Sequence, residues 1–193
     1  LVVQRYGADV DGGAEYHCRL MAEHLSRTHR VEVLTSCARD YITWANERPP
    51  GLERVNGVPV RRFKVRRPRD PERFGRISQK VFLGRHDRED ELSWLEEQGP
   101  LSPALLKHIR KHESDYDYFI FFSYRYYHSF HGVHAVPRKA LLVPTCEKDA
   151  VVSLGVFRDL FRLPRAIVYN SIEERAMIWA AAGNQAVRGE VVG

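Results

Sequence analysis

The chain has 193 residues, of which 44% are hydrophobic, and its formal net charge is +5. This length fits one domain, and the lack of an apolar run of about 20 residues excludes a membrane-spanning helix. Three widely spaced cysteines argue against a disulfide framework or a zinc site and favour a reducing, cytoplasmic setting. The chain shows no secretory signal and starts inside an apolar strand, so we expect further residues before Leu1.

The first third of the chain alternates strand-like and helix-like segments. Residues 1–5 form an apolar strand, and residues 14–28 form a helix with apolar positions at helical spacing. A strand at residues 30–36 is followed by an irregular stretch, 37–57, that contains a Pro-Pro-Gly breaker. The strand predicted at residues 58–65 alternates apolar and polar side chains with one slip, which indicates a bulge or an edge position.

The remainder of the chain continues this alternation. Residues 68–98 are highly charged and predict a loop with short helices, and residues 102–113 predict a helix. Ser171 and Glu174 have the spacing of a capping box at the start of the last helix. The other predicted elements are strands at 116–122, 139–143 and 166–170, and helices at 150–161 and 172–181.

Repeated strand–helix–strand units with apolar strands predict an α/β domain. Its sheet is expected to be mainly parallel, with helices on both faces, as in a doubly wound, Rossmann-like fold. Ligands of such folds bind beyond the carboxyl ends of the strands. The residues that directly follow each predicted strand are therefore the candidates for function.

A glycine pair follows the first strand. Gly12 and Gly13 lie where the loop enters the first helix, and a helix N-terminus offers free N–H groups and a positive dipole to a phosphate. Glycine lets the ligand approach the backbone closely. The spacing differs from the dinucleotide fingerprint G-x-G-x-x-G, and a simple tight turn is the alternative interpretation.

Four segments at predicted strand ends carry a family likeness over nearly the whole chain, which is weakest over residues 68–98. They are Gly12-Gly13-Ala14-Glu15, Phe121-Phe122-Ser123-Tyr124-Arg125-Tyr126-Tyr127, Leu142-Val143-Pro144-Thr145-Cys146-Glu147 and Tyr169-Asn170-Ser171-Ile172-Glu173-Glu174-Arg175. In their order and spacing the chain resembles the N-terminal domain of family-4 glycosyltransferases. The resemblance implies one half of a GT-B fold.

This resemblance implies transfer of a sugar from a UDP- or GDP-sugar to an acceptor, usually with retention at the anomeric carbon. It implies no metal and no cofactor besides the nucleotide sugar as co-substrate. The acceptor would be a small molecule or a sugar-linked or lipid-linked group. The nucleotide-binding C-terminal domain is absent from residues 1–193, so we expect this chain alone to be inactive.

The resemblance also suggests site residues. Gly12 and Gly13 would contact the donor phosphates, and Tyr124, Arg125 and Glu15 would contact the acceptor, since aromatic rings stack on sugars and arginine binds anions. In the alternative interpretation, two of the tyrosines in this cluster face the core, and Glu15 only favours the helix N-terminus.

Glu147 is the candidate catalytic residue. It stands where many family members have histidine, and this departure leaves its role open between binding a sugar hydroxyl, acting as a base and capping a helix.

Positive charge is concentrated in one segment, since residues 54–76 hold nine Lys/Arg and two Asp/Glu. The stretch from Arg61 to Arg69 predicts a solvated strand edge that resists unwanted pairing. The alternative is contact with an anionic acceptor or peripheral contact with the inner face of a membrane. No nucleic-acid-binding motif accompanies the charge.

Two other function classes remain open. One is a nucleotide-binding Rossmann module such as a dehydrogenase, although Thr35-Ser36-Cys37 supplies no ribose-binding acid after the second strand. The other is a non-catalytic domain that binds anionic surfaces. His108 and His112 have metal-ligand spacing on a helix, but a surface pair is the simpler interpretation. A metal site at His128, His131 and His134 is a weaker alternative, and we predict no metal.

Overall fold

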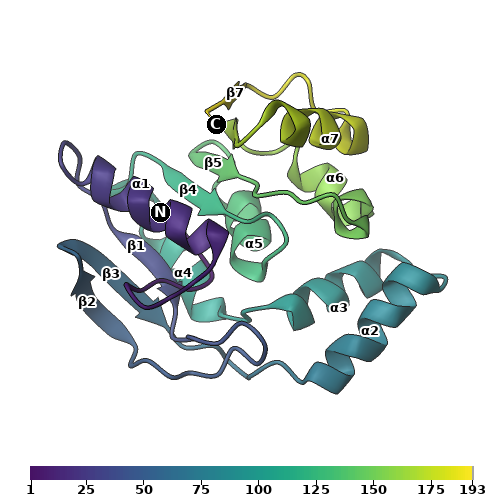
Figure 1. Ribbon diagram of the computed structural model, residues 1–193, viewed down its shortest axis with the longest axis horizontal. Helices are drawn as coiled ribbons and strands as arrows, with labels where there is room; N and C mark the ends of the chain where they lie inside the picture. The colour runs from purple at the N-terminus through teal and green to yellow at the C-terminus, as the bar shows by residue number, and fades with distance from the viewer. Residues whose placement is uncertain (193) are drawn as a thin grey trace.

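A mainly parallel β-sheet crosses the middle of the molecule, as the computed structural model of the chain shows for residues 1–192 (Figure 1). One half holds β1 (Val33–Ser36) between the amino-terminal segment and β3 (Val58–Phe63), with β2 (Gly51–Val55) pairing antiparallel outside β3. The strands of the other half are all parallel and run in the order β4 (Phe119–Phe122), β5 (Ala140–Val143), β6 (Ala166–Tyr169) and β7 (Gly189–Val191).

The amino-terminal segment joins the two halves of the sheet. Val2 forms parallel bridges to both Leu34 and Phe121, and its N–H donates to the carbonyl oxygen of Ile120 at 2.8 Å. On one side of Val2 the chain adds strands toward β3, and on the other it adds them toward β7. The strand order therefore reverses at this segment, which is the topological switch point of a doubly wound fold.

Helices cover both faces of the sheet. Helix α1 (Gly13–Leu25) lies on one face, where Cys18 and Ala22 pack against apolar strand residues such as Val60. The larger core lies on the other face and includes α4 (Pro103–Lys111), α5 (Tyr127–Ala135), α6 (Gly155–Leu160) and α7 (Ile172–Ala182). Two short 3₁₀ helices, Glu113–Asp115 and Ala150–Ser153, complete the connections. The expected Rossmann-like α/β fold is confirmed.

The charged stretch at residues 68–98 is a helical hairpin rather than a loop with short helices. Helices α2 (Pro71–Leu83) and α3 (Arg88–Gln98) lie side by side at the lower right of Figure 1. Asp70 accepts from two N–H groups at the start of α2, and Asp87 forms a capping box at the start of α3. Trp94 packs against Phe74 and Phe82, so a few aromatic contacts hold two otherwise polar helices together.

An unpredicted strand, β2, lies in the stretch expected to be irregular. Asn56 and Gly57 both have positive φ values, 49° and 83°, and connect β2 to β3 as a two-residue hairpin. Asn-Gly is a strong hairpin signal, because glycine and asparagine tolerate this backbone conformation. The polar composition of β2 follows from its exposed position at the end of the sheet.

The expected bulge or edge position of the 58–65 strand is wrong. Strand β3 ends at Phe63, lies between β1 and β2, and pairs with both in an unbroken register. Its burial alternates without a slip, because Arg62 takes the inward position that an apolar residue would normally occupy. The side chain of Arg62 is 2% exposed, so this arginine is part of the interior.

Within residues 1–192 no helix has both the length and the apolar character needed to cross a bilayer. The three cysteines are unbonded, with Cys18 and Cys37 buried and Cys146 partly exposed.

Candidate functional site

A cavity of about 470 Å³ opens at the carboxyl ends of the strands beside the switch point. Its walls come from the end of the amino-terminal segment, the start of α1, and the loops that follow β4, β5 and β6. A second cavity of about 670 Å³ lies at the amino ends of β1 and β4, next to Glu32 and Tyr116. Since α/β sheets bind ligands at the carboxyl ends of their strands, we take the first cavity as the candidate site.

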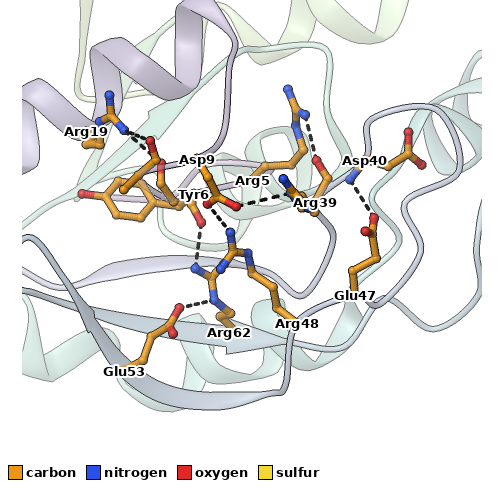
Figure 2. A network of polar contacts seen from close by, with 12 residues as sticks. Arg5, Tyr6, Asp9, Arg19, Arg39, Asp40, Glu47, Arg48, Glu53 and Arg62 are labelled. Carbon is orange, nitrogen blue, oxygen red and sulfur yellow. Dashed lines mark hydrogen bonds and ion pairs between the residues drawn. The ribbon is translucent and has the colours of Figure 1, made fainter.

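Arginines hold the loop that leads into the site. Arg62 Nη2 donates to the carbonyl oxygen of Tyr6 at 2.7 Å while its Nε pairs with Glu53 on the neighbouring strand (Figure 2). Arg48 pairs with Asp9 further along the loop. Burial lowers the pKa of Arg62, and Glu53 opposes that shift. The arginine in β3 therefore fixes the glycine loop.

Two further arginines hold the middle and the end of the loop. Arg19, on α1, donates from Nη1 to the carbonyl oxygen of Ala8 at 2.7 Å (Figure 2). Arg5, in the amino-terminal segment, donates from Nη2 to the carbonyl oxygen of Asp11 at 3.0 Å. Arg5 also reaches the carbonyl oxygen of Arg39 in the facing loop at 2.9 Å. Fixed carbonyl groups leave this loop few alternative conformations, so the start of α1 is held in place before any ligand binds.

The two glycines have different roles. Gly12 caps α1 with a φ of 153°, and a Cβ there would lie 2.3 Å from Oε2 of Glu15. Gly13 is the first helical residue, lines the cavity, and would place a Cβ in open space. Gly12 is therefore needed by the fold itself, while Gly13 presents a bare helix N-terminus to the cavity.

Glu15 lines the cavity but already has a partner. Its Oε1 accepts a hydrogen bond from Nε of Arg5 at 2.8 Å, and the side chain is 6% exposed. A buried carboxylate of this kind needs a paired cation, which Arg5 provides. Glu15 therefore orients Arg5, and this pairing occupies much of the carboxylate's capacity to bind an acceptor.

Tyr124 lies in the core and does not line the cavity, which corrects the expectation that it would contact an acceptor. Its ring is fully buried and packs against Phe157 and Phe161, at centroid distances of 4.8 and 5.1 Å. The aromatic side chain that lines the cavity is Tyr126, which meets Trp44 edge-on at 5.6 Å. Of the tyrosines in this cluster, Tyr126 and not Tyr124 lines the cavity.

Arg125 lines the cavity, as expected, but its charge is compensated. Its guanidinium pairs with the carboxylate of Asp149, which also accepts from the N–H of Val151. Burial alone would lower the pKa of Arg125, yet the neighbouring Tyr124 and Asp149 raise it overall. The arginine is thus a permanently charged brace between the loops after β4 and β5.

Ser123 and Thr145 form an unpredicted feature of the site. Ser123 directly follows β4, and Thr145 comes two residues after β5. Both residues have left-handed backbones, with φ values of 63° and 48° respectively. Their hydroxyl oxygens lie 2.6 Å apart, in hydrogen-bond contact at the cavity wall. Such conformations cost of order 1–3 kcal/mol for residues other than glycine and cluster at functional sites.

The two glutamates on the far wall differ in their partners. Glu174 accepts from the backbone N–H groups of Cys146 and Asn170, each at 2.6 Å, instead of completing a capping box with Ser171. The Ser171 hydroxyl does accept from the N–H of Glu174 at 3.1 Å. The carboxylate of Glu147 makes no hydrogen bond or ion pair within residues 1–192, so it is an unpaired carboxylate in the cavity lining.

The remaining candidates lie outside the site. Arg61 pairs with Glu32, Arg67 with Glu97, and Arg69 donates to main-chain oxygens including that of Glu97 at 2.9 Å. Several basic side chains of this segment therefore have partners, and Arg61 and Arg62 lie in a strand between two others and not at a free edge. Among residues 1–192 no group of three or more His, Cys, Asp or Glu side chains is arranged to hold a metal ion.

Comparison of the chain with protein-family models, with curated proteins and with solved structures finds no match.

Proposed function

We propose that the chain is the acceptor-side, N-terminal domain of a GT-B glycosyltransferase that uses a UDP- or GDP-sugar. The observation that carries the proposal is the cavity at the switch point, where the bare N-terminus of α1 at Gly13 and the free carboxylate of Glu147 line the same space. A helix N-terminus suits a phosphate, and an unpaired carboxylate suits sugar hydroxyls. The three unbonded cysteines favour a reducing, cytoplasmic setting for this activity.

The charges around the cavity assign the two substrates to different parts of it. Glu147 and Glu174 make the side of the cavity after β5 and β6 negative, whereas the dipole of α1 is positive beside Gly13. A diphosphate would therefore bind beside Gly13, and the cationic side chains that neutralise its charge would come from the nucleotide-binding domain. This division predicts weak nucleotide binding by residues 1–193 alone.

Glu147 has the chemistry to orient the acceptor. Its carboxylate accepts hydrogen bonds from acceptor hydroxyls and, when the nucleophile lies within about 3 Å, favours loss of the hydroxyl proton. Retaining transfer does not require a strong base, so we assign Glu147 to positioning the hydroxyl and to stabilising the charge that develops as it reacts.

A dehydrogenase-like module is the second candidate and finds less support. The end of β1, where a ribose-binding acid would stand, carries Ser36, whose hydroxyl donates to the carbonyl oxygen of Gln4 at 2.6 Å. The site of the expected carboxylate is thus occupied by a hydroxyl with a structural partner.

Calorimetric titration of UDP-glucose, GDP-mannose and NAD into the full-length protein tests the proposal. We expect one of the sugar nucleotides to bind, NAD to give no heat, and residues 1–193 alone to bind much more weakly. Glu147→Gln should lower transfer to acceptor without changing nucleotide affinity, while Glu113→Gln, in a short helix at the opposite end of β4, should change neither. Equal binding of NAD by both forms, with no response to sugar nucleotides, would refute the proposal.

A further inference from the structure

The inner cavity, the part of the cavity bounded by Gln4, Ser123, Thr145 and Asn170, has no unpaired arginine or lysine beside it among the described residues. The lining of the whole cavity contains one arginine, Arg125, which pairs with Asp149, and one histidine, His17. Arg5 lies outside this lining and pairs with Glu15. A phosphate or carboxylate in the cavity would lie near the carboxylates of the buried Glu174 and the exposed Glu147, and like charges repel.

The same wall is rich in uncharged polar groups. The hydroxyls of Ser123 and Thr145 share one hydrogen bond between them and so keep further donor and acceptor capacity. Asn170 donates its side-chain N–H to Glu174 and retains its amide oxygen as an acceptor. These groups suit a ligand that presents several hydroxyls.

Gln4 is the decisive residue. It lies at the end of the central strand segment, lines the cavity and is 2% exposed, yet its amide oxygen accepts no hydrogen bond from any described residue. Buried polar atoms nearly always have a partner, and one without it costs stability. The terminal torsion of a glutamine amide is soft, so this oxygen can turn toward a hydroxyl donor in the cavity.

We infer that the inner cavity binds an uncharged, hydroxyl-rich ring of the acceptor, a neutral sugar or cyclitol, and that Gln4 selects for it. This inference rests on the proposed function, since it names the acceptor class of the same site. A site built to hydrogen-bond hydroxyl groups discriminates strongly against ligands that leave its polar groups unpaired. Gln4 is thereby a specificity-determining residue, and an acceptor that carries a phosphate must keep that phosphate outside the inner cavity.

Saturation-transfer NMR on the full-length protein tests this, with myo-inositol and glucose as neutral probes and glucose 6-phosphate and glucuronate as anionic probes. We expect the neutral probes to bind and the anionic ones to bind at least tenfold more weakly. Equal or tighter binding of the anionic probes would overturn the inference.

The variant Gln4→Met keeps the shape of the side chain and removes the amide. We expect it to weaken binding of the neutral probes roughly 3- to 10-fold, the size of one hydrogen bond, without lowering the melting temperature, because the lost oxygen had no partner. Gln79→Met, on the exposed side of α2, is the matched control and should change nothing. Unchanged probe binding by Gln4→Met, or binding lost together with stability, would contradict a role in selection.

A parallel titration with UDP and GDP separates this inference from the proposed function. Binding of myo-inositol without any nucleotide binding would remove the glycosyltransferase proposal and leave the neutral-ring site standing. Nucleotide binding with no response to the neutral probes would do the reverse.

Discussion

The carboxylate of Glu174 accepts a hydrogen bond from the backbone N–H of Cys146 at 2.6 Å, which ties the first turn of α7 to the loop after β5. Its other oxygen accepts from the N–H of Asn170, also at 2.6 Å, at the end of β6. Glu174 is 5% exposed, so one buried carboxylate organises two strand ends without a basic partner. The wall that carries Glu147 depends on this arrangement.

Glu174→Gln should destabilise the protein, because an amide NH₂ would replace one of the two carboxylate oxygens and face a backbone N–H donor without an acceptor. We expect a loss of about 1–3 kcal/mol in the free energy of unfolding, measured by urea denaturation. Glu173→Gln, on the exposed side of the same helix turn, is the control and should stay within about 0.5 kcal/mol of the parent. Equal stabilities for the two variants would show that the Glu174 hydrogen bonds contribute nothing.

Substitution of the two adjacent glycines should have opposite consequences. Gly12→Ala places a methyl group against the Glu15 carboxylate and forces a φ of 153° on a residue with a Cβ, so we expect a loss of about 1–3 kcal/mol. Gly13→Ala meets no atom within 4 Å and should leave stability unchanged while weakening nucleotide diphosphate binding. Thermal unfolding and calorimetry of both variants measure this, and tight nucleotide binding by Gly13→Ala would count against phosphate contact at the helix N-terminus.

The buried arginine of β3 should matter much more than its exposed neighbour. Arg62→Met leaves the carbonyl oxygen of Tyr6 without its donor and frees the glycine loop, at a cost of about 1–3 kcal/mol. Arg61→Met breaks a partly exposed pair with Glu32 and should cost about 0–1 kcal/mol. Urea denaturation compares the two, and a larger effect for Arg61 would contradict the interior role of Arg62.

Acid should destabilise the protein well before its carboxylates titrate. Burial lowers the pKa of His128 to about 3 and that of His131 to about 4, from an ordinary value near 6.5. Below pH 6.5 the unfolded chain binds protons that the folded chain excludes, so the free energy of unfolding falls by up to about 1.4 kcal/mol per pH unit for each histidine. This stability is fully present above pH 6.5 and is lost as the pH falls toward 4.

The variant His128→Phe removes one of these two histidines and so tests its share of the acid destabilisation. Its unfolding free energy should fall less steeply between pH 6.5 and 5 than that of the parent, while His24→Phe, at an exposed position of α1, should follow the parent curve. Parallel curves for all three proteins would mean that His128 is protonated in the folded state.

Much of the fold follows from local sequence patterns. The apolar strands and the switch from strand to helix at the glycine pair rest on short-range periodicity and turn chemistry, and these features agree with the structure. Gly13, Glu15, Arg125 and Glu147 line one cavity, because parallel strands bring their carboxyl ends together.

The differences arise where tertiary contacts decide. The left-handed backbone of Ser123 turns the chain so that Tyr124 enters the core and Tyr126 faces the cavity. Serine rarely adopts a left-handed backbone, so the sequence does not predict this turn. Arg62 occupies an inward position of β3 where the sequence pattern predicts an apolar residue. Its partners Glu53 and Tyr6 lie in other segments, so its burial could not be predicted from β3 alone. Gln4 was overlooked, since a missing hydrogen-bond partner is visible only in three dimensions.

The position of the amino-terminal segment in the middle of the sheet has a consequence for how the protein is made. Val2 is synthesised well before one of its two neighbouring strands, which lies at Phe121. Until then one edge of the central strand has exposed main-chain groups, and the pairing that completes the sheet is a long-range contact of the kind that slows folding. The nascent chain therefore depends on β4 to protect the main-chain groups around Val2, and conditions that stall synthesis before β4 should leave a product prone to aggregate.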